Sequence, residues 1–426
     1  MKVLGIITEY NPFHNGHLYH LKQSIKLTSA DVVICIMNGN FMQRGLPAVT
    51  DKWSRTKMAL KNGVDLLIEL PLVYGIRSAE YFARGSIKLL DNTKVVDDIV
   101  FGSELGNIRP LQYLSELLLK EPDEYKQYLK KYLGSGNPFP SAREKAVIEY
   151  LNKNVTDINL DKNQIKSIIK EPNNILGIEY LKALAEINSR IKPLTIKRTH
   201  KNYHSLKTTN KIASATAIRN QLYQNPVQIT GLRKLIPESS YQILKDDLSK
   251  GKIPLNKNFL GIMILSKLRQ IPVSELRRYA EISNGLEYRI NQAAQKSGSL
   301  FELISNIKTK AFTRTRIQRN LLHILFDISS RDFALIDEVG PQYFRVLGFS
   351  NKGEKILSRI NFNSHLPIIT QPASYLKSIN TESLDILEKQ LSFDLLASDI
   401  YSLLFKNPEI RRGQKDYYHQ IIKMEN

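Results

Sequence analysis

The amino-acid sequence predicts an α/β fold, with a parallel, doubly wound sheet in its first half and a mostly α-helical second half. Short apolar runs alternate with helical patterns, and we expect the strands at residues 2–8, 31–37, 64–70, 95–101 and 193–198. The interval between the last two runs is too long for one crossover connection and carries the apolar spacing of helices. After about residue 225 the alternation stops, and helical patterns separated by Pro, Gly and Asn continue.

These patterns divide the chain into two expected domains. Residues 1–225 are expected to form the sheet domain, with a helical insertion at about residues 105–190. Residues 226–426 are expected to form a basic, mostly α-helical domain, because apolar residues such as Ile317, Leu321 and Ile324 recur there at the helical period.

The composition is that of a folded protein with excess positive charge. Hydrophobic residues make up 42% of the 426 residues, and no apolar run approaches the length of a membrane span. The beginning of the chain lacks a signal-peptide cleavage site, and the single cysteine, Cys35, lies in a strand-like apolar run, so we expect a cytoplasmic protein. The net charge of +20 favours a polyanionic partner, either nucleic acid or an anionic membrane surface, over a generically basic composition.

The stretch from Thr8 to His17 is the first candidate site. It follows the first apolar run and opens into a helical pattern, and a strand, turn and helix in this order often hold phosphate groups. His14 and His17 flank Asn15 and Gly16, so imidazole donors lie beside a glycine that permits close approach of a ligand. The spacing with His20 also allows a metal site, but no cysteine or carboxylate nearby completes a ligand set, and we expect no metal there.

A second candidate lies at the expected helix that ends the sheet domain. Ser214 and Thr216 precede or begin this helix, and Arg219 follows in its first turns. The two hydroxyl groups are ordinary helix caps in one interpretation. In the other they bind phosphate oxygens together with Arg219.

Several blocks of sequence resemble one family. The His-x-Gly-His core and the block ending at Arg219 are similar to motifs of the nucleotidyltransferase superfamily. The chain also resembles the bacterial tRNA(Met) cytidine acetate ligases along its length, in blocks at residues 38–45, 52–57, 101–104, 172–177, 196–199, 313–319 and 344–349. This resemblance implies a Rossmann-like nucleotidyltransferase domain followed by a helical tRNA-binding domain.

The resemblance also implies a reaction and its participants. ATP and acetate would give acetyl-adenylate and diphosphate, and the acetyl group would then pass to N4 of the wobble cytidine of elongator tRNA(Met), releasing AMP. Mg²⁺ is expected from the chemistry of ATP, although no dedicated ligand set is visible in the sequence. We expect no membrane association and no obligate protein partner. The alternatives are a small-molecule adenylyltransferase and an RNA-binding protein that keeps ATP as a structural ligand.

The site residues follow from the same resemblance, with His14 and His17 as the catalytic pair. The implied ATP site consists of Ile7, Thr8, Glu9, Tyr10, Asn11, Pro12, Phe13, His14, Asn15, Gly16, His17, Leu18, Tyr19, His20, Gly102, Asn173 and Arg198. Read from the residues alone, Gly102 is also explained by a turn, Asn173 by a helix cap and Arg198 by an ion pair or a nucleic-acid contact.

Further cations are weaker candidates. Lys52 and Arg55 lie at an expected helix start, where positive charge opposes the helix dipole, so we expect them to bind phosphate. Gln43 and Arg44 belong to a polar loop that either closes over ATP or acetate or simply connects two elements. Candidates for tRNA phosphate contacts, each of which is otherwise an ordinary solvated charge, are Lys201, Lys207, Arg314, Arg316 and Arg319.

Overall fold

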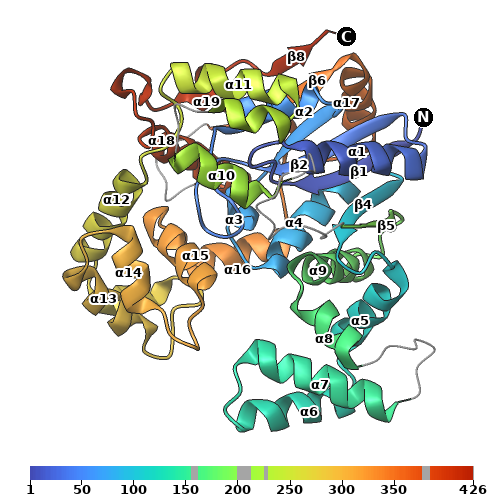
Figure 1. Cartoon of the computed structure of the whole chain (residues 1–426), viewed down its shortest axis with the longest axis vertical. Helices are drawn as coiled ribbons and strands as arrows, with labels where there is room; N and C mark the ends of the chain where they lie inside the picture. Colours follow the sequence, from blue (N-terminus) through green and yellow to red (C-terminus); the bar gives the residue numbers. More distant parts are fainter. Residues whose placement is uncertain (155–161, 199–212, 225–228, 377–383, 426) are drawn as a thin grey trace.

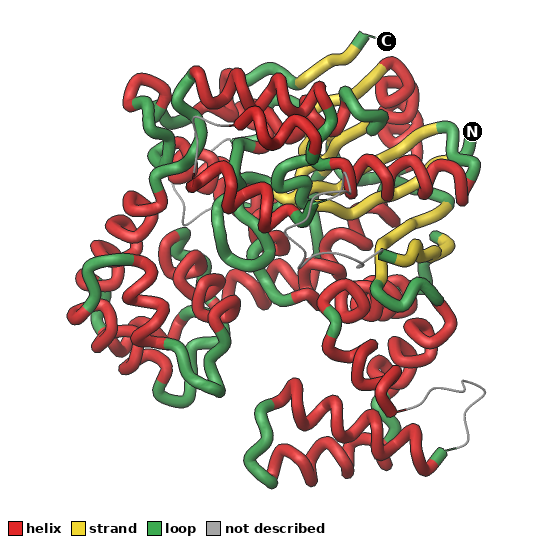
Figure 2. Tube along the Cα trace, viewed as in Figure 1, coloured by secondary structure: helices red, strands yellow, loops and turns green. Residues whose placement is uncertain are grey.

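The apolar runs of the first half form the core of a mixed sheet (Figures 1 and 2). The computed structural model describes residues 1–154, 162–198, 213–224, 229–376 and 384–425. Within these residues the sheet has eight strands in the order β5-β4-β1-β2-β3-β6-β7, and β8 pairs with β6. The strands are β1 (Val3–Thr8), β2 (Val32–Asn38), β3 (Leu66–Leu70), β4 (Asp98–Ser103), β5 (Lys192–Lys197), β6 (Phe344–Ser350), β7 (Ile368–Ile369) and β8 (Ile422–Met424).

The five predicted strands are confirmed, and they are parallel to one another. Successive residues of β2 belong to different hydrophobic clusters: Val32 and Ile34 pack on one face of the sheet, Val33 and Cys35 on the other. A strand buried on both faces reads as a continuous apolar run, which is why the sequence reveals strands such as β2 and β3. Cys35 is completely buried in β2.

Helices cover both faces of the sheet. One face packs against α1 (Asn15–Thr28), α2 (Lys52–Leu60), α10 (Ala215–Gln224) and α11 (Glu238–Ser249). The other face packs against α3 (Leu72–Gly75), α4 (Ala79–Asn92), α9 (Pro172–Glu186) and α17 (Asn351–Asn363). This three-layer arrangement places the beginning of α1 at the carboxyl end of β1, where open α/β sheets bind ligands.

Two groups of helices extend below the sheet in the view of Figure 1. The first is the predicted insertion, which continues into α9 and consists of α5 (Ile108–Lys120), α6 (Asp123–Gly134), α7 (Phe139–Lys153) and α8 (Lys162–Lys170). The second group, from the second half of the chain, consists of α12 (Lys257–Gln270), α13 (Leu286–Lys296), α14 (Leu300–Ile307) and α15 (Arg314–Leu325). No helix of the described ranges is both long enough and apolar enough to cross a membrane.

The second half is less purely helical than predicted. Its remaining helices are η1 (Ile229–Lys234), η2 (Val273–Arg278), α16 (Ser330–Val339), η3 (Pro372–Ser374), α18 (Ile386–Ser402), η5 (Pro408–Ile410) and α19 (Lys415–Tyr418). However, β6, β7 and β8 also belong to this half, and β6 pairs antiparallel with β3. The second half therefore contributes strands to the sheet of the first.

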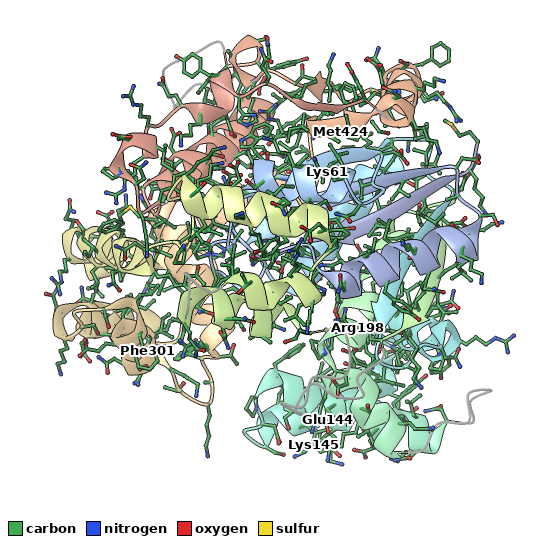
Figure 3. The ribbon with its side chains drawn as sticks, turned by 45° about the horizontal axis from the view of Figure 1, so that its top comes forward. Lys61, Glu144, Lys145, Arg198, Phe301 and Met424 are labelled. Atoms are coloured by element: carbon green, nitrogen blue, oxygen red, sulfur yellow. The ribbon has the colours of Figure 1, made fainter. Side chains whose placement is uncertain are left out.

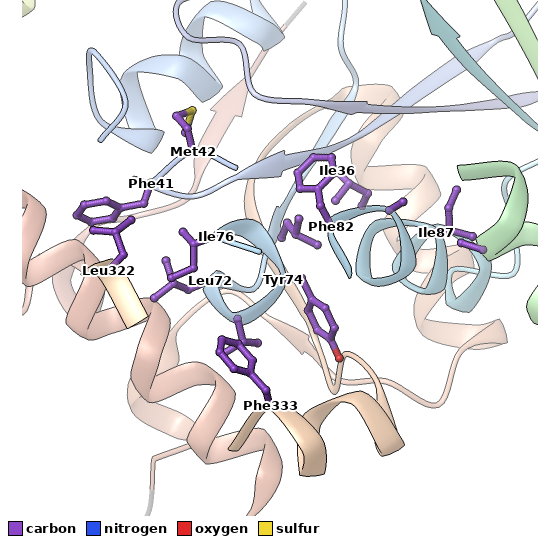
Figure 4. Close-up of a cluster of buried hydrophobic side chains, with 14 of the residues drawn as sticks. Ile36, Phe41, Met42, Leu72, Tyr74, Ile76, Phe82, Ile87, Leu322 and Phe333 are labelled. Carbon is purple, nitrogen blue, oxygen red and sulfur yellow. The ribbon is translucent and has the colours of Figure 1, made fainter. Parts of the chain in front are cut away.

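Side chains from both halves also share one hydrophobic core (Figure 4). Phe41 and Leu72 from the first half lie close to Leu322 of α15, and Phe333 of α16 lies near Tyr74 (Figure 4). The hydroxyl of Tyr74 donates to the carbonyl of Ile336 at 3.0 Å, so the contact includes polar groups. The predicted domain boundary between residues 225 and 226 lies outside the described residues.

Candidate active site at the beginning of helix α1

A cavity of about 330 Å³ opens where the carboxyl ends of β1, β4 and β5 meet the beginning of α1. Arg198 stands at its edge, at the end of β5, where the sheet gives way to the insertion helices (Figure 3). The cavity is lined by Ile6, Ile7, Thr8, Glu9, Tyr10, His14, Gly16, His17, Tyr19, His20, Gln43, Arg44, Ala79, Phe82, Phe101, Gly102, Pro172, Asn173, Leu176, Tyr180, Ile196, Lys197 and Arg198. Most of the residues predicted for the ATP site therefore come together here.

His14 and His17 form a reciprocal cap at the first turn of α1. Nδ1 of His14 accepts a hydrogen bond from the backbone N–H of Gly16 at 3.0 Å, and Nδ1 of His17 accepts one from the N–H of His14 at 3.3 Å. The rings stack with 3.7 Å between their centroids. Because both Nδ1 atoms accept, each neutral ring carries its proton on Nε2. The Nε2–H groups are thus the donors left for a ligand.

The three histidines of the cavity are poor bases. Burial, followed by the charges of Arg198 and Arg219, lowers the pKa of His14 to about 3. Burial and Arg198 lower the pKa of His20 to about 4, and burial together with His14 lowers the pKa of His17 well below its usual value. At neutral pH these rings are uncharged hydrogen-bond donors beside a helix N-terminus, which suits an anionic ligand.

The turn before α1 fixes the ring of His17. Tyr10 and Phe13 contact it, with ring centroids 5.0 Å and 5.8 Å away. Tyr10 adopts a φ of 43°, which turns the chain sharply after β1, and its hydroxyl lies 3.6 Å from Sγ of Cys35. Phe13 is completely buried. Phe13 therefore supports His17 from the hydrophobic core without reaching the cavity, whereas Tyr10 both contacts His17 and lines the cavity.

Asn11 and Asn15 anchor the same turn to other segments. The side-chain oxygen of Asn11 accepts from the N–H of Val49 at 2.7 Å. The side-chain nitrogen of Asn15 donates to the carbonyl of Lys234 at 3.0 Å. Asn11, Pro12, Phe13, Asn15 and Leu18 are outside the cavity lining, so any contact they make with ATP stays a prediction.

The three distant residues of the predicted ATP site lie together on the cavity. A Cβ atom on Gly102 would lie 3.1 Å from Cγ of Arg198, so the glycine leaves room for the arginine side chain to cross the end of β4. Asn173 occupies the first turn of α9, where its backbone N–H and its amide nitrogen donate to Oε1 of Glu104. Arg198 is exposed, and its side chain has no hydrogen bond or ion pair with the described residues.

The segment from Ser214 to Arg219 contacts the turn that precedes α1. Oγ of Ser214 accepts from the N–H of Ala217 at 3.1 Å, as a helix cap does. Arg219 donates to the carbonyl of Asn11 at 2.8 Å and to Oγ1 of Thr216 at 3.0 Å. None of Ser214, Thr216 and Arg219 lines the cavity formed by the described residues, so their phosphate contacts stay predictions.

Lys52 and Arg55 correct the sequence-based prediction. Both side chains are completely buried. Nζ of Lys52 contacts carboxylate oxygens of Glu69 at 2.7 Å and Asp416 at 2.5 Å. Arg55 donates to backbone carbonyls, including those of Glu9 at 2.8 Å and Asn38 at 3.0 Å. Their charges are taken up by the protein itself, so neither side chain is available to bind phosphate.

The residues predicted to contact tRNA differ in the solvent exposure of their side chains and in their partners. Lys201 and Lys207 lie outside the described residues. Arg314 is exposed at the start of α15, with its guanidinium 5.6 Å from the ring centre of Phe301. Arg316 donates to the carbonyl of Glu281 at 2.6 Å, and Arg319 is only 11% exposed, 3.9 Å from the carboxylate of Glu281. Of the last three, Arg314 has the most accessible charge.

The polar loop and the apolar wall complete the cavity. Gln43 and Arg44 line it, which favours the interpretation of this loop as part of the site. Phe82 of α4, with Leu176 and Tyr180 of α9, forms part of the opposite wall. These wall residues carry no recognisable signal in the sequence, because apolar residues at helical spacing indicate a core and not a ligand site.

Comparisons with known proteins identify the family of this chain. A family model described as HIGH Nucleotidyl Transferase matches residues 1–416. A tRNA(Met) cytidine acetate ligase of Halothermothrix orenii is 55% identical over 99% of this chain and 100% of the relative, and one of Acetivibrio thermocellus is 42% identical over the full length of both. The chain is also similar to the crystal structure of Thermotoga maritima TmcAL bound with alpha-thio ATP. The two align over 100% of both chains, with a TM-score of 0.91 and 36% sequence identity. The chain therefore belongs to the HIGH nucleotidyl transferases and, within them, to the tRNA(Met) cytidine acetate ligase family.

Proposed function

We propose that this protein uses ATP to activate acetate as acetyl-adenylate and then transfers the acetyl group to N4 of the wobble cytidine of elongator tRNA(Met). The products are N4-acetylcytidine, AMP and diphosphate, and the reaction takes place in the cytoplasm. The observation that carries this proposal is the stacked pair of neutral histidines at the beginning of α1, set in a cavity that also contains Gly102, Asn173 and Arg198.

In the first step, an acetate oxygen attacks the α-phosphate of ATP, and diphosphate leaves. Negative charge grows on the phosphate oxygens during this attack, and fixed donors that face the growing charge lower the barrier. The Nε2–H groups of His14 and His17 supply such donors without needing to reorganise, because the capping hydrogen bonds hold both rings. Arg44 and Arg198 add positive charge on the cavity wall.

Magnesium enters this proposal as the companion of ATP. Among the described residues no group of three or more His, Cys, Asp or Glu is arranged to hold a metal ion. The mechanism therefore assigns no step to a Mg²⁺ ion held by the described residues alone.

In the second step, the amine of the cytidine attacks the acetyl carbonyl, and AMP leaves. The cytosine must leave the anticodon stack to reach the cavity, and aromatic side chains commonly hold bases displaced in this way. Phe82 and Tyr180 bound the cavity, although each side chain is only 3% exposed. Arg314 and its neighbours on α15 would contact RNA phosphates, which positions the tRNA without reading its sequence.

Nucleoside mass spectrometry tests the proposal directly. Elongator tRNA(Met) incubated with the protein, ATP and acetate should gain N4-acetylcytidine, and omission of either ATP or acetate should abolish the product. Exchange of labelled diphosphate into ATP should require acetate. Exchange that proceeds without acetate would favour a small-molecule adenylyltransferase. Binding of ATP and tRNA with neither exchange nor acetylation would favour an RNA-binding protein with a structural ATP.

A further inference from the structure

Glu9 is a carboxylate on the cavity wall that the activation step does not use. It is the first residue after β1, it is half-buried, and it lines the cavity. Its Oε1 accepts hydrogen bonds from the backbone N–H of Gln43 at 2.7 Å and from Nδ2 of Asn38 at 3.3 Å. Its Oε2 has no hydrogen-bond partner among the described residues. One oxygen therefore fixes the carboxylate, and the other keeps its capacity to accept a proton.

The position of Glu9 separates two differently built walls. On one side, His14 and His17 present donors at the beginning of α1. On the other, the largely buried rings of Phe82 of α4 and Tyr180 of α9 bound the cavity. The charge of Glu9 adds to burial in raising the pKa of Tyr180, so the carboxylate lies within electrostatic reach of the aromatic wall. A base bound against that wall would lie near the carboxylate of Glu9.

The second step needs such a group. The N4 amine of cytosine is a weak nucleophile because its lone pair is delocalised into the ring, and it must lose a proton as it forms the amide. A carboxylate is the side chain that ordinarily accepts a hydrogen bond from the cytosine N4 amine. The histidines cannot accept this proton through Nδ1, because their Nδ1 atoms already accept backbone hydrogen bonds.

We propose that Glu9 is the catalytic base of the acetyl-transfer step. Its Oε2 accepts one N4–H of the flipped cytidine and takes that proton as N4 forms its bond to the acetyl carbon. The bond between the acetyl carbon and the phosphate oxygen breaks, and AMP leaves with the electron pair. The proton on Glu9 then passes to water. This inference rests on the proposed function and assigns the group that receives the proton in its second half-reaction.

A Glu9→Gln variant tests the proposal, because the amide keeps an oxygen for Gln43 and Asn38 but loses the basic oxygen. Two products are measured from the same protein. N4-acetylcytidine in saturating tRNA(Met) reports the complete reaction. Acetohydroxamate formed from ATP, acetate and hydroxylamine reports acetyl-adenylate, since hydroxylamine is a strong nucleophile that needs no base. Glu171→Gln is the matched control: Glu171 immediately precedes the cavity residue Pro172 but does not itself line the cavity.

We expect Glu9→Gln to lower acetyl transfer to tRNA about 100-fold or more relative to its rate of acetohydroxamate formation, the usual size of a general-base contribution. Glu171→Gln should leave the ratio of the two products as in the wild type. Equal losses of both products in Glu9→Gln, or no loss of either, would overturn the role of Glu9. A wild-type protein that makes no acetohydroxamate would instead contradict the proposed function, and this inference with it.

Discussion

The first turns of α1 and α2 make an instructive comparison, because both helices follow a parallel strand and its turn. The first turn of α1 carries two histidines whose Nδ1 atoms satisfy backbone N–H groups and leave the Nε2–H groups facing a cavity. The first turn of α2 begins with Asp51, whose carboxylate caps the helix by accepting from the N–H of Ser54 at 2.7 Å. Its cations point into the protein, where Lys52 pairs with two carboxylates and Arg55 donates to backbone carbonyls.

This difference shows what separates a ligand-binding site from a buried ion pair that stabilises the fold. A cation near a helix N-terminus suggests an anionic partner, but the partner of Lys52 is the pair of carboxylates of Glu69 and Asp416. Neutral donors at α1 can exchange water for phosphate at little cost. A buried ammonium that already has two carboxylates cannot. Substitutions at the starts of the two helices test this distinction.

Lys52→Met should destabilise the fold by about 3–5 kcal/mol, because it leaves Glu69 and Asp416 as uncompensated buried charges. Denaturant unfolding measures this loss. Lys57→Met is the matched control: Lys57 is exposed on the same helix, and its replacement should change the free energy of unfolding by less than about 0.5 kcal/mol. A stable Lys52→Met protein with weakened ATP binding would restore α2 as a phosphate site and remove the contrast with α1.

His17→Ala should lower acetate-dependent ATP–diphosphate exchange by about 100-fold to 1,000-fold, the usual effect of removing one preorganised donor. His14→Ala should act similarly, with an added loss of about 1 kcal/mol of stability because His14 also caps α1. Circular dichroism verifies that both variants fold. Lys22→Ala, an exposed position on α1, serves as the control. Near-normal exchange in both histidine variants would contradict the role assigned to the first turn of α1.

The pH dependence of stability sharpens the same comparison. His14 has a pKa of about 3 in the folded protein and about 6.5 in an unfolded chain. Below pH 6.5 His14 is therefore protonated in the unfolded state but stays neutral in the folded state until the pH approaches 3. His14→Asn keeps a residue suited to capping but removes this titration. The stability of the wild type relative to this variant should therefore be highest above pH 6.5 and fall by about 2 kcal/mol between pH 7 and pH 5. A difference that stays constant would show that folding does not lower the pKa of His14.

Arg198→Ala should weaken ATP binding by about tenfold, or 1.4 kcal/mol, with little change in stability. The reason is that its side chain is exposed and has no ion pair with the described residues, so its charge is available to a ligand. Isothermal titration calorimetry with ATP measures the effect. Lys192→Ala, at the other end of β5, is the control because Lys192 is exposed but does not line the cavity. Unchanged affinity in Arg198→Ala would remove it from the ATP site.

Elements of the fold could be predicted when their signal lay in contiguous residues of the sequence, and not when it depended on distant partners. The strands β1 to β5 were predictable because each is an apolar run followed by a helical pattern. The strand β6 was missed, although it is completely buried, because Arg345 interrupts its apolar pattern. That arginine is tolerated because it donates to the carbonyl of Thr370 at 2.7 Å, a partner that composition does not reveal.

The site divides in the same way. The turn before α1 is contiguous in sequence, and its histidines could be recognised from their spacing and setting. The error at Lys52 arose because its partner Asp416 lies 364 positions away. Glu9 was predicted as an ATP residue, but its orientation depends on Asn38 and Gln43, which come from beyond the following helix. Such pairs of residues can be recognised only from the folded structure.

The pairing of β6 with β3 has a consequence for biosynthesis. The strand β3 lies inside the sheet only after β6, about 280 residues later in the sequence, has been synthesised. Until then its edge presents unpaired N–H and carbonyl groups between apolar side chains, which is the kind of edge that promotes aggregation. The counter-charge Asp416 reaches Lys52 later still. A nascent or truncated first half should therefore depend on chaperones, and expression of residues 1–225 alone should yield aggregated rather than folded protein.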